Sequence, residues 1–184
     1  MFPHLVAFVI VLAPIPPAAK NSNPFQLAKV GDYATFNCTL SIMGTPPLLT
    51  TVTYTVTSKT EKEVSIRITG TANGKEIPPQ ERKLDLTKTF DPSKLIMAHG
   101  FEDVKVEIVK QGVEKLKLDG KERETAWTTY KVTGKVNVEL IELDVKLWVS
   151  KDVPGVLAGM EYTLHFAGTK SEVKAELTET GKKQ

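Results

Sequence analysis

The sequence has almost no cysteine and very little histidine. Cys38 is the one cysteine in 184 residues, so an internal disulfide and a cysteine-based zinc site are both excluded. The three histidines are His4, His99 and His165, and they are far apart in the chain. The sequence therefore predicts no metal site, and Cys38 is expected to be a buried, small apolar residue.

Motifs that carry common catalytic chemistry are also missing. There is no Gly-x-Ser-x-Gly nucleophile elbow and no glycine-rich phosphate loop. Two weak alternatives remain: Cys38 as a nucleophile, which would need a basic partner in space, and His99 as a metal ligand beside Glu102 and Asp103. We expect no enzyme activity, no catalytic residue and no cofactor.

A strong excess of either sign of charge is absent. Lys and Arg total 24, Asp and Glu total 22, and the charges alternate along the chain without a basic cluster. Nucleic-acid-binding proteins usually concentrate basic residues on one face, so a nucleic-acid partner is not expected. Hydrophobic residues make up 41% of the chain, which is enough to form a core.

Long apolar runs are absent except near the start. Residues 5–15 are almost entirely apolar, too few to span a bilayer, and they are typical of the central region of a secretory signal peptide. We predict a signal peptide over residues 1–19, a single β domain over residues 20–184, export to the periplasm or beyond, and no membrane span after the leader is removed. The alternative is that this run forms a buried N-terminal strand.

Alternation of apolar and polar residues is the dominant pattern of the remaining chain. Residues 51–57 are the clearest case, with Val52, Tyr54 and Val56 separated by threonines. Asn73-Gly74 and Asp119-Gly120 are typical of tight hairpin turns. About ten strands joined by short turns predict an all-β fold, with at most one short helix, because parallel strands would need long crossovers. The expected form is a strongly curved antiparallel sheet, half-barrel or barrel-like.

Several interruptions predict local irregularity. Pro78-Pro79 excludes a central strand there. Gln111-Gly112 indicates a break, and a phase shift at Leu140-Ile141 indicates a β-bulge within one long strand over residues 135–150. Residues 94–100 could form a helical turn.

Aromatic residues are few, at 7% of the chain, and one aromatic-rich corner is the best candidate for a functional site. The tryptophans could line a ligand cleft, or the segment could be a structural corner in which Trp packs, Asp bonds nearby amides and Pro sets a turn. The residues concerned are Trp148, Ser150, Asp152, Pro154, Trp127 and Tyr130.

The segment Lys146 to Leu157 resembles a motif of exported bacterial proteins of uncharacterised function, many from planctomycete-type genomes. In those proteins a strand ending Trp-x-Ser is followed by Asp-Val-Pro, glycine and a Met-Glu strand. The resemblance covers roughly residues 104–184. The chain is also loosely similar to curved half-barrel domains of the periplasmic lipoprotein-carrier type, and this similarity implies a fold but no function.

Two functions follow as hypotheses. The first is a non-catalytic binding or carrier domain outside the cytoplasm, with a lipid or another hydrophobic ligand held in an apolar concavity. The second is a structural or protein-interaction module of the cell envelope, whose sheet edge or polar face meets an envelope protein.

Overall fold

A computed structural model describes residues 23–42, 44–96, 102–118, 120–136, 139–150, 153, 157–166 and 168–183. The predicted signal peptide over residues 1–19 lies outside the described residues. So do His99, Asp152 and Pro154, and with them the candidate metal ligand and part of the candidate corner.

The described chain forms one antiparallel sheet of nine strands, in the order β4-β3-β2-β1-β9-β8-β7-β6-β5. The prediction of a curved antiparallel half-barrel is confirmed, with nine strands rather than about ten among the described residues. The strands are β1 (Asp32–Ile42), β2 (Leu48–Lys59), β3 (Glu63–Ala72), β4 (Lys75–Asp85), β5 (Glu102–Leu118), β6 (Lys121–Val136), β7 (Glu139–Val149), β8 (Leu157–Phe166) and β9 (Thr169–Lys182).

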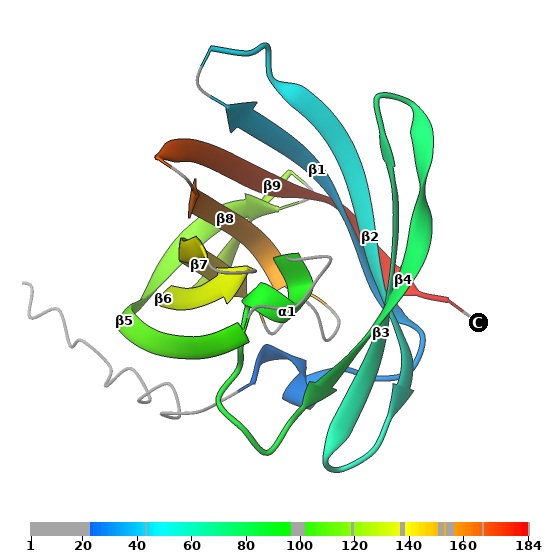
Figure 1. The fold of residues 1–184 in the computed structure, drawn as a ribbon. Coiled ribbons are helices and arrows are strands. Elements are labelled where there is room, and N and C mark those ends of the chain that lie inside the picture. The colour runs from blue at the N-terminus through cyan, green and yellow to red at the C-terminus, as the bar shows by residue number, and fades with distance from the viewer. Residues whose placement is uncertain are drawn as a thin grey trace, which may run out of the picture.

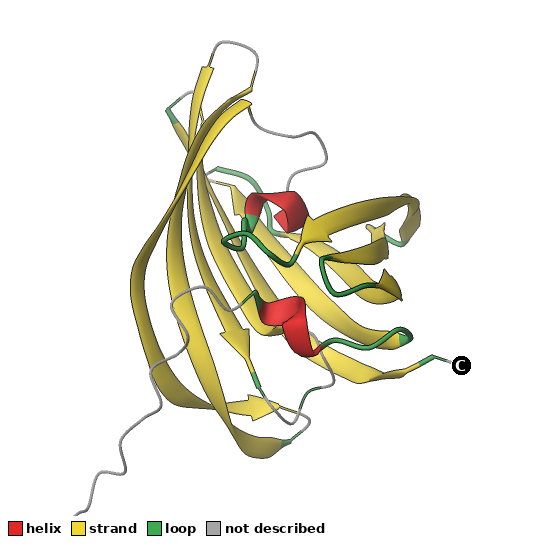
Figure 2. Cartoon of the chain, turned by 90° about the horizontal axis from the view of Figure 1, so that it is seen from below, coloured by secondary structure: helices red, strands yellow, loops and turns green. Residues whose placement is uncertain are grey.

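Two short helical segments complete the fold. They are the 3-10 helix η1 (Pro24–Leu27) and α1 (Ser93–Ile96), and both lie on the inner side of the curved sheet (Figures 1 and 2). The helical turn predicted over residues 94–100 is therefore present but begins at Ser93, and residues 97–100 lie outside the described part of the chain.

The predicted long strand with a bulge at Leu140-Ile141 is wrong. β6 ends at Val136 and β7 begins at Glu139, and these two residues face each other as antiparallel partners. The chain therefore reverses direction where the sequence shows a phase shift. A hairpin and a bulge both shift the apolar positions from even-numbered to odd-numbered residues, so the alternation pattern alone cannot distinguish them.

The predicted break at Gln111-Gly112 is also wrong. β5 continues through both residues for a length of 17 residues. A Cβ atom added to Gly112 would lie 2.6 Å from Cζ2 of Trp127 on the neighbouring strand. Glycine is present here because the indole ring of Trp127 occupies the space where a side chain would stand.

The sheet is open along one side, where β4 and β5 are its two edges. Pro78 and Pro79 lie in β4, which is an edge strand rather than a central one, in agreement with the prediction. The register of β3 and β4 shifts at these prolines, so neither of them has a ladder partner. The Asn73-Gly74 turn before β4 has positive φ at both residues (50° and 75°), as predicted.

The main core lies on the inner face, where the two helical segments fill one end. The Phe25 ring of η1 lies 6.0 Å from that of Phe90, which lies 6.1 Å from that of Tyr130 on β6. Lys59 holds η1 in place by donating to the backbone oxygens of Gln26 and Ala28. These contacts close this end of the half-barrel, where Phe25 is fully buried.

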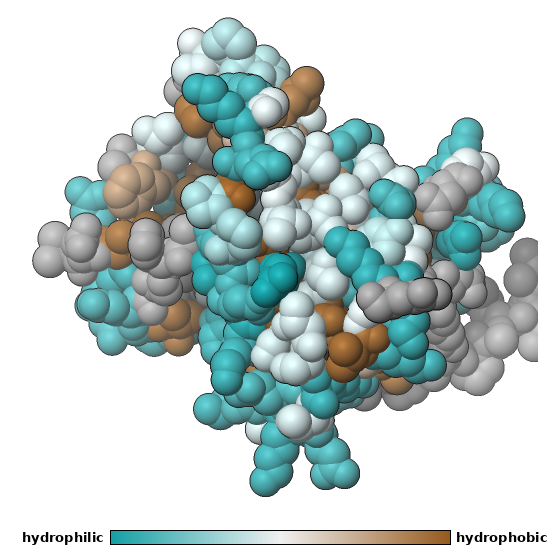
Figure 3. All heavy atoms as spheres, turned by 90° about the vertical axis from the view of Figure 1, so that its right-hand side faces the viewer, coloured by the Kyte–Doolittle hydropathy of each residue, from teal (hydrophilic) through white to brown (hydrophobic). Residues whose placement is uncertain are grey.

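The outer face is polar, and hydrophilic and intermediate residues dominate the side shown in Figure 3. Threonines of neighbouring strands lie side by side there, and the hydroxyls of Thr35 and Thr53 are 2.9 Å apart. Helices in the described part of the chain are all too short to cross a membrane.

Candidate functional site

A cavity of about 200 Å³ lies on the inner face of the sheet, beside α1. Its walls are mainly apolar side chains of β1, β2, β3, β8 and β9, with Leu95 and Ile96 of α1 on one side. The lining residues are Cys38, Leu40, Thr50, Val52, Tyr54, Ile68, Thr69, Ile77, Pro78, Gln80, Leu95, Ile96, Met160, Tyr162 and Val173.

The titratable groups of this cavity are uncharged at neutral pH. Burial raises the pKa of the Cys38 thiol to about 11 and that of the Tyr162 hydroxyl to about 12. The pKa of Tyr54 is raised further still, for the same reason. Desolvation disfavours the charged form of each group, so the walls offer apolar contact rather than charge. The prediction that Cys38 is buried is confirmed, with 8% of the residue exposed.

Two polar side chains of β4 also face inward. Gln80 is the partner of Ile68 across the ladder, and Arg82 is the partner of Ile66. Partners in an antiparallel ladder point to the same face, so both polar groups share the face of the core isoleucines. A guanidinium nitrogen of Arg82 donates to the side-chain oxygen of Gln80 at 2.5 Å. The cavity thus has polar side chains at two places: Gln80 on the edge strand, and Thr50 on β2, the ladder partner of Cys38.

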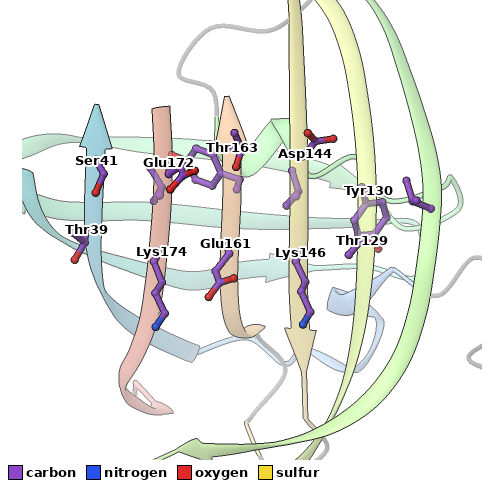
Figure 4. Close-up of a pocket in the computed structure, with 14 residues that line it drawn as sticks. Thr39, Ser41, Thr129, Tyr130, Asp144, Lys146, Glu161, Thr163, Glu172 and Lys174 are labelled. Atoms are coloured by element: carbon purple, nitrogen blue, oxygen red, sulfur yellow. The ribbon is translucent and has the colours of Figure 1, made fainter. Parts of the chain in front are cut away.

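A larger hollow of about 680 Å³ lies over strands β1, β9, β8, β7 and β6 (Figure 4). Polar side chains from these strands dominate its lining. Lys146, Glu161 and Lys174 form a row across it, and the lining residues are Thr39, Ser41, Val109, Thr129, Tyr130, Asp144, Val145, Lys146, Glu161, Tyr162, Thr163, Glu172, Val173 and Lys174.

The charges of that hollow are largely paired within the protein. Lys146 bonds Glu114 at 2.8 Å and Lys174 bonds Glu176 at 2.9 Å. Surface ion pairs of this kind contribute little to stability. Although the hollow is larger than the inner cavity, its alternating lysines and carboxylates are typical of a solvated sheet face, and we do not assign it a ligand.

The tryptophans of the predicted corner meet on this outer face. Trp127 and Trp148 are direct partners across β6 and β7. The Lys146 ammonium lies 4.7 Å from the Trp127 ring centre and 4.4 Å from that of Trp148. Glu114 of β5 accepts hydrogen bonds from both Lys146 and the Trp148 indole N–H, and these bonds hold the pKa of its carboxyl below the ordinary value.

This corner is filled by the protein itself. Trp148 is only 6% exposed and packs in a second apolar cluster with Leu118, Val153 and Ala158. Gly159 lies opposite, where an added Cβ would stand 3.3 Å from the Trp148 ring. Such packing leaves the Trp148 ring no open face for a ligand and supports the structural interpretation.

The structure brings together only part of the predicted site. Trp127, Trp148 and Ser150 lie near one another, and Ser150 donates to the backbone oxygen of Glu124 at 3.1 Å. Tyr130 does not belong with them: it lies on the inner face against Phe90. Asp152 and Pro154 lie outside the described residues, so their predicted roles stay predictions.

Sequence reasoning missed Gln80 and Arg82. The available signal was their spacing: Gln80, Arg82 and the buried Leu84 follow at intervals of two residues, which places all three on one face of the strand. Among the described residues, three or more His, Cys, Asp or Glu side chains nowhere gather closely enough to hold a metal ion.

Comparison with known proteins yields no match to a protein family and no match to a curated protein. Three solved structures follow a chain path similar to that of this protein. A Bacteroides fragilis protein with a YmcC-like fold, inferred to be exported, is 11% identical over 83% of this chain and 97% of its own, with a TM-score of 0.47. A Parabacteroides distasonis protein inferred to be a lipoprotein is 13% identical over 84% and 98%, with a TM-score of 0.48.

The third similar structure is the hypothetical lipoprotein YmcC of Escherichia coli. It is 11% identical over 88% of this chain and 94% of its own, with a TM-score of 0.34. At these identities the likeness concerns the path of the chain alone. The resemblance to planctomycete-type proteins stays a prediction.

Proposed function

We propose that this protein is a non-catalytic binding domain that holds the apolar part of a small hydrophobic ligand in the inner cavity, outside the cytoplasm. The observation that carries the proposal is the cavity itself, an uncharged space of about 200 Å³ within a core otherwise packed by side chains. Apolar cavities with a few polar groups are the usual form of small-molecule sites.

The size of the cavity restricts the ligand. Pockets for drug-sized molecules measure roughly 300–1,000 Å³, and this one is smaller. A single short alkyl chain, or the end of a longer one, suits the space better than a whole diacyl lipid. Burial of such a chain would be driven by the apolar area removed from water.

Cys38 provides a direct test, because the chain's one thiol lines the cavity. The purified protein is alkylated at pH 9 with N-ethylmaleimide, with and without octanoate, octanol or octylamine, and the rate is followed by mass spectrometry. A ligand in the cavity should slow alkylation at least several-fold. If no alkyl compound slows the reaction, the proposal is wrong.

A matched pair of variants locates the effect. Val52→Trp places a large side chain in the cavity, whereas Thr55→Trp places the same side chain on the other face of β2. The first should abolish protection by all three compounds and the second should leave it unchanged. Equal behaviour of the two variants would show that the ligand binds elsewhere.

A protein-interaction module of the cell envelope is the second candidate. Exposed apolar side chains at one set of strand ends favour it, namely Leu49, Val104, Leu140 and Phe166. Crosslinking in the native cell tests this role. Recovery of the uncrosslinked monomer alone would exclude this role. If the Leu49→Lys variant is crosslinked to the same partner as the wild type, these strand ends are not the contact surface.

A further inference from the structure

We propose that the inner cavity binds an alkyl ligand with an uncharged hydrogen-bond acceptor near one end, such as a ketone or ester carbonyl, and that the hydroxyl of Tyr54 donates to it. This inference rests on the proposed function and names the ligand class of the same site. Its basis is a hydroxyl at the inner end of the cavity that the described residues leave without a hydrogen-bond partner.

Tyr54 is a buried tyrosine whose hydroxyl needs a partner. It lines the cavity with only 4% of its surface exposed, and none of the described residues forms a hydrogen bond with its hydroxyl. The hydroxyl oxygen is nevertheless not sealed within the packed core, so it faces the cavity. A buried hydroxyl without a partner costs free energy, and buried tyrosines usually find one. The ligand is therefore expected to supply the missing partner.

The Tyr54 hydroxyl keeps its proton. Burial raises its pKa far above the ordinary value of 10.0, and the Cys38 thiol and the Tyr162 hydroxyl raise this pKa further. Both of these groups also line the cavity, close enough to Tyr54 to interact with it electrostatically. A protonated phenol donates one hydrogen bond, so the Tyr54 hydroxyl suits a ligand atom that accepts.

The lining of the cavity favours an uncharged acceptor over a charged one. Among the described residues that line it there is no Lys, Arg, His, Asp or Glu. A charged head would lose its hydration on entry and meet no opposite charge in this lining, which is costly. A carbonyl group loses much less, and one hydrogen bond from Tyr54 would offset that loss.

Tyr54 lies at the inner end of the cavity. Exposure falls along the inward residues of β2, from the half-buried Thr50 and Val52 to Tyr54 and then to Val56, which is 2% exposed. The Tyr54 ring is held there by an edge contact with Phe36, with the ring centres 5.8 Å apart. A ligand that reaches this hydroxyl enters with its acceptor first, so the acceptor lies near one end of the alkyl chain.

The half-buried side chains of Thr50 and Gln80 offer an alternative position for the polar group of the ligand. A polar group held there would stay partly hydrated, and the Tyr54 hydroxyl would have no role in binding. The two explanations differ in what they predict for Tyr54→Phe, because this substitution removes the hydroxyl and keeps the ring.

The test measures protection of Cys38 from N-ethylmaleimide at pH 9 by 2-hexanone, hexane and hexanoate, with affinities taken from the dependence of the alkylation rate on the concentration of each compound. Tyr54→Phe should weaken the binding of 2-hexanone about 2- to 10-fold, the usual effect of one hydrogen bond, and leave that of hexane unchanged. Tyr130→Phe, at a buried tyrosine of the inner face that does not line the cavity, is the matched control and should change neither. Hexanoate should bind the wild type at least about 10-fold more weakly than 2-hexanone.

Urea denaturation without ligand separates binding from a structural role of Tyr54. Because the described residues give its hydroxyl no partner to lose, Tyr54→Phe should keep the unfolding midpoint of the wild type. A lower midpoint would show that the hydroxyl already has a partner in the protein and would overturn this inference.

The binding outcomes separate this inference from the proposed function. If octanol protects Cys38, this inference alone is overturned by any of three results: no protection by 2-hexanone, a 2-hexanone affinity that Tyr54→Phe leaves unchanged or lowers no more than that of hexane, or tighter binding of hexanoate than of 2-hexanone. Failure of every alkyl compound, octanol included, to protect Cys38 would overturn the proposed function and this inference with it.

Discussion

The two faces of the sheet use their side chains in opposite ways. On the outer face, the aromatic corner of Trp127 and Trp148 is packed so closely that Gly112 is needed to make room for a ring. On the inner face, a lining of mainly apolar residues, with two tyrosines and one cysteine, leaves a cavity of about 200 Å³. The aromatic residues that stand out in the sequence as a candidate site therefore form the tightly packed region, whereas the open space lies among residues that the sequence did not mark as a site.

The largest expected effect is the loss of Trp148. Trp148→Ala removes a buried ring from the second cluster and should lower the free energy of unfolding by about 3–5 kcal/mol, measured by urea denaturation. Phe166→Ala, at a residue 39% exposed, should cost less than about 1 kcal/mol. If the two variants lose similar amounts of unfolding free energy, the corner is not tightly packed, and it becomes a candidate ligand site again.

Gly112→Ala should be the next most damaging change. The new methyl group would stand 2.6 Å from Trp127, and overpacking of this kind costs about 1–3 kcal/mol. Gly159→Ala meets its nearest atom at 3.3 Å and should cost less. The order of the two unfolding midpoints checks this prediction, and the reverse order would contradict the packing described for the corner.

The inner face should tolerate added volume near the cavity and not at the closed end. Cys38→Leu extends into the cavity and should change stability by less than about 1 kcal/mol in either direction. Ala34→Leu, on the same strand and face but fully buried, should cost about 1–3 kcal/mol. Equal costs in thermal unfolding would mean that the cavity has no room for a ligand.

The smallest effect is a pH dependence at the outer corner. Bonds from Lys146 and Trp148 hold the pKa of Glu114 below its ordinary value of 4.5. A carboxyl whose pKa is lowered by folding stabilises the protein above pH 4.5, and this contribution is lost as the pH falls through the lowered value. Glu114→Gln should therefore weaken the protein slightly at pH 7 and reduce the stability lost in acid. Identical acid profiles of the two proteins would show that these bonds contribute nothing.

The period-two pattern predicted the sheet, its antiparallel connections and its polar outer face, because each depends on local alternation. The same rule could have separated Tyr130 from Trp127, since residues three apart on a strand lie on opposite faces. The cavity could not be predicted, because its volume depends on how β1, β4, β8 and α1 pack, and these segments are far apart in sequence.

The pairing of β1 with β9 has a consequence for how the protein folds. Seven of the eight ladders join strands that are neighbours in the chain, so two separate meanders, β1–β4 and β5–β9, can form from local contacts. The remaining ladder joins β1 to β9 and pairs residues from opposite ends of the described chain, such as Asp32 and Lys182. Closure of that seam is the entropically costly step, and it should limit the rate of folding. The seam also brings the first and last strands of the sheet together, with the Lys183 amide bonded to the Gly31 oxygen at 2.8 Å. A permuted chain opened between β4 and β5 would turn this slow, long-range step into a local one and should fold faster.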